Sequence, residues 1–204
     1  FLDFPVFIFL KLNTRPFVFF ITRALLICFL DNSPIPYTSN DLNSKDIRGG
    51  ENVIIHISKE LAKLNNYVEV FNNNSANQIF DNVKWTNINN TNKENVFDYA
   101  FTNNDIRLFN KISAKKYIAF SHSIQSIEKF IRKGQLLSFL KYKPKVILLG
   151  KYHDNNRNFL LKIFGKINLQ WAVDPLFLET EVNESNVENR AIFTSRRDRN
   201  LDIL

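Results

Sequence analysis

Residues 47–70 read IRGGENVIIHISKELAKLNNYVEV and hold the only adjacent glycine pair of the chain, Gly49-Gly50. Behind the pair, apolar residues recur with the spacing of one α-helical face. The last letters of the stretch belong to YVEVF (67–71), whose β-branched and aromatic residues are typical of a strand. The stretch therefore predicts a glycine turn, then a helix, then a strand. The apolar positions of the helix are Val53, Ile54, Ile57, Leu61 and Leu64.

The same alternation extends along the chain. Residues 24–31, ALLICFLD, form a continuous apolar run that ends in Asp31, as expected of a strand buried on both faces. Further strands are expected at 82–88, 96–102, 115–122, 144–150 and 166–173, and further helices at 104–113, 123–140 and 155–164. Strands separated by helical segments form a mostly parallel sheet with helices on both faces. The predicted fold class is thus α/β, a Rossmann-like domain of three layers.

The cysteine and histidine content argues against disulfide-bonded and metal-binding proteins. The single cysteine, Cys28, excludes a disulfide within the chain and favours a reducing compartment. The three histidines are far apart in sequence, so no metal site is expected. The many asparagines carry no functional weight, because a nucleotide bias of the source genome explains them as well as any function.

The positive charge is concentrated in the middle of the chain. Residues 107–166 hold 14 lysines and arginines against Glu128 and Asp154, whereas the whole chain has a net charge of +7. Such a segment favours an anionic partner, either phosphate, a membrane surface or nucleic acid. A solvated lysine-rich face explains the same pattern equally well.

The ends of the chain differ from its middle. Residues 1–23 are rich in phenylalanine, but Lys11, Asn13, Arg15 and Pro16 divide them into two apolar runs too short to span a bilayer. They read as a membrane-associating leader or as a segment outside the domain. Since the chain contains no methionine, it reads as a fragment of a longer protein.

Three loops that follow strands carry polar chemistry. They contain Gly49-Gly50, Ser121 to Ser123, and His153-Asp154. Ligands of parallel sheets bind at the carboxyl ends of the strands, and glycines let backbone N–H groups approach an anion at the start of a helix. A plain entry into the helix would use the same glycine pair. The pattern G-x-G-x-x-G does not follow the first strand, which disfavours an NAD(P) oxidoreductase.

In order and spacing, three stretches resemble a known family. RGGENVIIHISKELAKLNNYVEV (48–70), YIAFSHS (117–123) and LQWAVDPLFLET (169–180) are similar to the N-terminal, acceptor-side domain of retaining GT-B glycosyltransferases of family 4. The resemblance implies that residues 24–178 form the N-terminal glycosyltransferase domain. Residues 179–204 then resemble the linker and the first strand of a truncated second domain.

Two positions depart from the family pattern. Asn52 stands where the family usually has glutamate, and Ser195 replaces a glycine. The resemblance implies that Gly49, Gly50, Arg196 and Arg199 bind the donor diphosphate, that His122 is the catalytic residue, and that Glu51 and Ser123 lie on the acceptor side.

The resemblance implies a cytoplasmic enzyme that transfers a sugar from a nucleotide-sugar to a glycan or lipid-linked acceptor, without metal or other cofactor. This fragment alone is expected to be inactive. The basic amphipathic stretch 123–145 extends the expectation to the inner face of the cytoplasmic membrane, although a helix packed on the sheet has the same pattern. Nucleic acid is not an expected partner, because no RRM, KH or helix-turn-helix signature is present. The alternative is a non-catalytic Rossmann-like module that binds a phosphate-bearing ligand or a partner protein.

Overall fold

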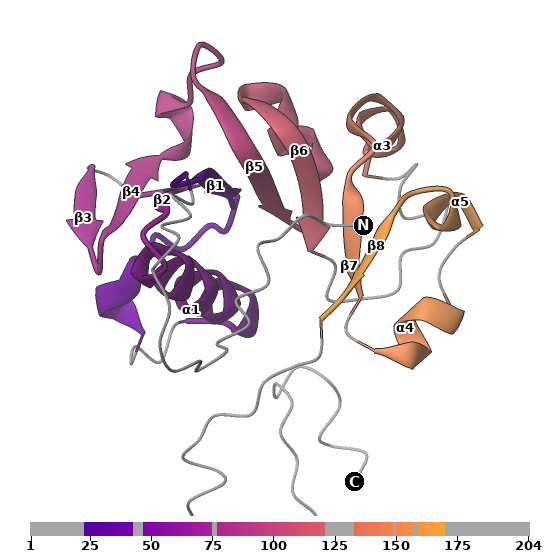
Figure 1. Ribbon diagram of the computed structural model, residues 1–204, viewed down its shortest axis with the longest axis horizontal. Helices are drawn as coiled ribbons and strands as arrows, with labels where there is room; N and C mark the ends of the chain where they lie inside the picture. The colour runs from indigo at the N-terminus through magenta and orange to yellow at the C-terminus, as the bar shows by residue number, and fades with distance from the viewer. Residues whose placement is uncertain are drawn as a thin grey trace, which may run out of the picture. The chain divides into compact units, whose positions relative to one another are not determined.

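The computed structural model describes residues 23–42, 47–74, 77–120, 133–148, 150–156 and 159–169. Within them one eight-stranded sheet has the strand order β3-β4-β2-β1-β5-β6-β7-β8 (Figure 1). Neighbouring strands pair in parallel, except for the antiparallel pair of β3 and β4. The predicted α/β class with a mostly parallel sheet is confirmed.

The strands are β1 (Leu26–Leu30), β2 (Tyr67–Asn72), β3 (Gln78–Phe80), β4 (Val83–Asn87), β5 (Val96–Asn103), β6 (Ser113–Phe120), β7 (Lys145–Leu148) and β8 (Lys166–Asn168). The α-helices are α1 (Gly49–Lys63), α3 (Leu136–Tyr142), α4 (Lys151–Asn155) and α5 (Phe159–Lys162). Three 3₁₀ helices, η1 (Ser39–Asp41), η2 (Ile88–Asn90) and η3 (Ile106–Lys111), lie in the connections. Among the described residues, no helix has both the length and the apolar character needed to cross a bilayer.

The core has two parts, one on each face of the sheet. On one face α1 buries Ile54 and Ile55 in a cluster with residues of β1, β2 and β4. On the other face η3, α3 and α5 bury Phe109, Phe139 and Leu161 in a second cluster. Helical segments therefore cover both faces, which is the layering that the alternation of strands and helices predicts.

β1 lies inside the sheet between β2 and β5, which explains its unbroken apolar sequence. Cys28 and Leu30 are fully buried on one face, and Ile27 and Phe29 on the other. Burial raises the pKa of the Cys28 thiol well above its ordinary value, so the thiol stays protonated at neutral pH.

Several elements differ from the sequence expectations. The glycine pair belongs to the first turn of α1 rather than to a turn before it. The expected helix at 104–113 is the 3₁₀ helix η3, which Asp105 caps, and the one at 155–164 is divided, with α4 ending at Asn155 and α5 beginning at Phe159. β3 was not predicted, because this short edge strand exposes its central Ile79 and lacks a buried apolar pattern. The expected domain boundary between 178 and 179 lies outside the described residues.

Candidate functional site

The carboxyl ends of four neighbouring strands carry a row of polar side chains. Asn72, at the end of β2, is the register partner of Asn87, at the end of β4. Asp31 and Asn103 continue the row one position beyond the last paired residues of β1 and β5. Because parallel strands end at the same edge of a sheet, the four side chains lie side by side along that edge.

The direction of the chain connections changes within this row. From β1 the chain crosses to β2 on one side, whereas from β5 it crosses to β6 on the other side. Open α/β sheets bind their ligands at such a switch point, outside the carboxyl ends of the strands. The amide Nδ2 of Asn103 reaches across it and donates to Oδ1 of Asp31 at 3.5 Å. We call the described residues of the loops that follow β1 and β5, together with the start of α1, the switch-point site.

Asp31 is a buried carboxyl group at the centre of the site, with 3% of its surface exposed. The hydroxyl of Tyr37, itself fully buried, donates to Oδ2 of Asp31 at 2.8 Å. Burial, together with the negative charge of Glu51, raises the pKa of Asp31 from 3.8 to about 6, against the opposing effect of its hydrogen bonds. Asp31 therefore changes its charge close to neutral pH, as titratable groups of functional sites often do.

Glu51 links the loop after β1 to the first turn of α1. The hydroxyl of Ser33 donates to Oε1 of Glu51 at 2.6 Å, and both residues are buried. A carboxylate in the first turn of a helix is also stabilised by the helix dipole. Glu51 thus holds the loop from inside, and its expected place on the acceptor side stays a prediction.

Three consecutive asparagines hold the same loop from β2. Nδ2 of Asn72 donates to the backbone oxygen of Tyr37 at 2.7 Å, and Nδ2 of Asn74 donates to the same oxygen at 3.0 Å. The amide of Asn73 donates to the backbone oxygen of Ser33. Side-chain amides therefore satisfy the carbonyl groups of a loop that forms no ladder of its own, as buried backbone groups require.

α1 begins at the carboxyl edge without a side-chain cap. Arg48 is the N-cap residue in an extended conformation, and its side chain makes no capping hydrogen bond. A Cβ atom added to Gly49 would meet no heavy atom within 4 Å, so the space beside this residue is open. The first N–H groups of a helix lack intrahelical partners and carry the positive end of its dipole. The predicted glycines are therefore at the edge where an anion would approach.

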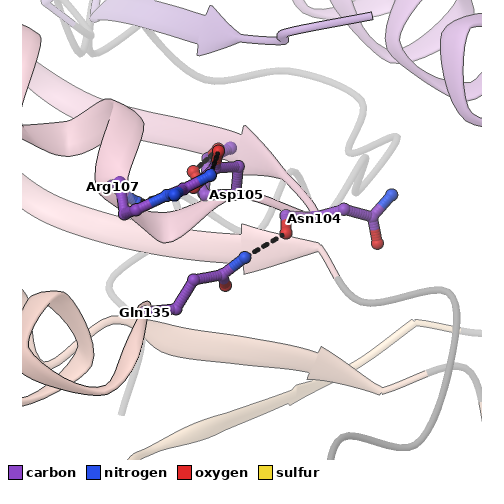
Figure 2. A network of polar contacts seen from close by, with 5 residues as sticks. Asn104, Asp105, Arg107 and Gln135 are labelled. Atoms are coloured by element: carbon purple, nitrogen blue, oxygen red, sulfur yellow. Dashed lines mark hydrogen bonds and ion pairs between the residues drawn. The ribbon is translucent and has the colours of Figure 1, made fainter. Parts of the chain in front are cut away.

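A second polar network attaches the loop after β5 to the residue before α3 and to η3 (Figure 2). Nε2 of Gln135, the buried residue before α3, donates to the backbone oxygen of Asn104 at 3.1 Å. Asp105 caps η3 by accepting from the backbone N–H of Arg107 at 3.1 Å, and the Arg107 guanidinium donates to both carboxylate oxygens of Asp105, at 2.8 and 2.7 Å. These contacts fix the loop to η3 and α3.

The exposed groups at the site are hydrogen-bonding groups. Asn32 and Asn104 follow the two strands of the switch point, and Arg48 and Gly49 begin α1; all four residues are exposed. Amides and a guanidinium bind hydroxyl and phosphate oxygens. The site thus suits a sugar-like or phosphate-bearing ligand. Within the described residues, no group of three or more histidine, cysteine, aspartate or glutamate side chains is arranged to hold a metal ion.

Four of the predicted site residues lie outside the described residues. They are His122, Ser123, Arg196 and Arg199. β6 ends at Phe120, two residues before His122, and belongs to the same carboxyl edge. Their expected roles stay predictions.

Sequence reasoning missed the side chains that build the site. Asp31 was taken only as the end of a strand, and Tyr37 and Asn72 were not selected. A signal was present, because strands β1, β2, β4 and β5 each end at or next to an aspartate or asparagine. The attribution of asparagine to genome bias hid this recurrence.

Comparison of the chain with protein-family models, curated proteins and solved structures gave no match.

Proposed function

We propose that this chain is the acceptor-side domain of a GT-B glycosyltransferase. The enzyme transfers a sugar from a nucleotide-sugar to a glycan or lipid-linked acceptor, as in the synthesis of a surface polysaccharide or glycolipid. The observation that carries the proposal is the position of α1, whose uncapped start at Gly49-Gly50 lies at the carboxyl edge beside the switch point.

The start of α1 supplies the interaction with the donor. The N–H groups of Gly49 and Gly50 bind the diphosphate, and the exposed guanidinium of Arg48 adds a permanent positive charge. As the bond between sugar and diphosphate breaks, negative charge grows on the leaving group, and fixed N–H dipoles stabilise it. Asp31 and Glu51 support this site by holding the loop after β1 through their hydrogen bonds with Tyr37 and Ser33.

The remaining roles rest on the family resemblance. His122 orients the acceptor hydroxyl or the transferred sugar, Arg196 and Arg199 face the diphosphate, and Ser123 lies on the acceptor side. The enzyme works in the cytoplasm, at the inner face of the membrane where its acceptor is lipid-linked, and needs no metal. Transfer requires the donor-binding second domain that the resemblance implies.

Binding of the diphosphate group alone to the 204-residue chain tests the proposal, because the rest of the donor would bind the second domain. Inorganic pyrophosphate is titrated while the backbone amide signals are followed by NMR. We expect the signals of Gly49 and Gly50 to shift, and Gly49→Val to weaken binding by roughly tenfold, because the new side chain occupies the open space through which the diphosphate approaches.

Gly150→Val is the matched control. Gly150 follows the β7 region, and a Cβ atom added there also meets nothing within 4 Å. This variant should bind as the parent chain does. Equal affinity of the Gly49→Val variant and the parent would contradict the assignment of the diphosphate to α1. Tight binding in a polypeptide that carries a second domain but transfers no sugar would favour the non-catalytic alternative.

A further inference from the structure

We propose that α3 and α5 form a surface that docks on anionic lipid headgroups. We call it the α3–α5 surface and define it by the apolar side chains of Leu137, Leu140, Phe159 and Ile163. The membrane expectation from sequence rested on the stretch 123–145, of which the structure describes residues 133–145. Lys141 and Lys143 belong to that stretch, whereas Phe159 and Ile163 of the α3–α5 surface lie outside it. This surface is proposed whether or not the chain takes part in sugar transfer.

The apolar side chains of this surface point into solvent. The exposed fractions are 79% for Leu137, 52% for Leu140, 64% for Phe159 and 75% for Ile163. A single exposed apolar residue needs no explanation, but a group of large ones marks an interaction surface. These residues are not needed for the core, because other residues of the same segments, such as Phe139, already pack against the sheet.

The two helices present their outer sides on the same side of the sheet. Phe139 of α3 and Leu161 of α5 belong to one buried cluster on one face. The ring of Phe139 also packs on Phe164, just after α5, with the ring centres 5.7 Å apart. α3 and α5 therefore cover the same face, and both lie near the β7–β8 end of the sheet (Figure 1).

The charged residues around these side chains are mostly lysines. The described residues between 133 and 169 include seven lysines and one acidic residue, Asp154, whose carboxylate pairs with Lys166. Lys141 lies on α3, Lys143 follows it, and Lys162 lies on α5; all three are exposed. Lysines beside apolar side chains give both parts of interfacial binding, attraction to anionic headgroups and insertion of apolar groups below them.

Other occupants fit the surface less well. Three of the four apolar residues are aliphatic and offer no ring on which a nucleic-acid base can stack. A second copy of the chain would bring two sets of lysines together, and like charges across an interface oppose association. An anionic bilayer meets both the charge and the apolar groups.

Sedimentation of the full chain with lipid vesicles tests the inference. Vesicles of phosphatidylglycerol and phosphatidylcholine in equal parts should bind the chain, and vesicles of phosphatidylcholine alone should bind it at least tenfold more weakly. Leu137→Ser and Ile163→Ser should each reduce partitioning roughly tenfold, since each removes one large apolar side chain. Lys143→Glu and Lys162→Glu should each reduce it at least fivefold, and added salt should weaken binding.

Ile79→Ser and Lys93→Glu are the matched controls. Ile79 is 72% exposed on β3, at the opposite edge of the sheet, and Lys93 is exposed between β4 and β5. Both variants should bind vesicles as the parent chain does, and thermal unfolding should show that all six variants fold. Equal partitioning of the surface variants and the controls would overturn the inference. So would RNA binding that only the lysine variants lose, or a dimer that Leu137→Ser dissociates.

Discussion

Replacing Asp31 by asparagine is expected to favour the folded chain at neutral pH. The pKa of Asp31 is about 6 in the folded chain, against 3.8 for an ordinary aspartate. Below about pH 3 both states are protonated, so the buried group carries no charge. Between pH 4 and pH 6 the folded state holds its proton more tightly than the unfolded state does, and stability is lost as the pH rises through this window. Asparagine never ionises and avoids that loss.

The size of the effect follows from the two pKa values. Their difference corresponds to about 3 kcal/mol. The free energy of unfolding of Asp31→Asn, relative to the parent, should therefore rise by about that amount between pH 3 and pH 7. Urea unfolding followed by circular dichroism at several pH values measures this difference.

Asp98 provides a control of opposite sign. Hydrogen bonds from the backbone N–H of Leu26 and from Lys115 lower the pKa of Asp98. Its ionised form thus contributes stability at neutral pH that is lost as the pH falls through the lowered pKa. Asp98→Asn should destabilise the chain at neutral pH and have less effect in acid. A stability difference between Asp31→Asn and the parent that stays constant with pH would contradict the burial of a charged Asp31.

Replacing Asn72 by alanine is expected to cost about 2 to 4 kcal/mol of the free energy of unfolding. Asn72 is fully buried. Its Nδ2 donates to the backbone oxygen of Tyr37 at 2.7 Å, and its Oδ1 accepts from the backbone N–H of Asn74 at 3.0 Å. Alanine leaves this N–H without its partner away from water and deprives the Tyr37 carbonyl of one of its two donors.

Chemical denaturation of the variant beside Asn90→Ala checks this expectation. Asn90 is exposed at the end of η2. Its replacement should change the free energy of unfolding by less than about 0.5 kcal/mol. Because the Asn72 contacts hold the loop that bears Tyr37, the variant should also broaden the NMR signals of residues 31–38. Equal stabilities of the Asn72→Ala and Asn90→Ala variants would mean that the hydrogen bonds of Asn72 do not stabilise the fold.

Local patterns were enough to predict most of the sheet. β1 and β7 lie within residues where the sequence predicts strands, and β2, β5 and β6 overlap such residues, because the apolar runs of an internal parallel strand are distinctive. β4 and β8 also lie within predicted strands. The helix of residues 53–64 was predicted for a similar reason, since one of its faces packs on the sheet. β3 was not predicted, because an edge strand buries few side chains and therefore needs no run of apolar residues.

The candidate site was predicted only in part. The glycine pair was placed at the carboxyl edge from its position before a helix and after a strand, and α1 does begin there. The association of Asp31 with Tyr37 and Asn103 was not predicted, because Asn103 is 72 residues from Asp31 in sequence. No local pattern indicates which side chain of a distant strand end will face a given carboxyl group.

The sequence by itself determined the class of the fold, since the periods of its apolar residues reflect burial on one face of a helix or on both faces of a strand. Only the tertiary structure decided which strands became neighbours and where the connections change direction. Strand order brings Asp31 beside Asn72 and Asn103, and burial at this place raises its pKa, against the lowering effect of the hydrogen bond from Asn103. The chemistry of the site therefore depends on contacts between residues far apart in the chain, whereas the fold class depends on patterns within short segments.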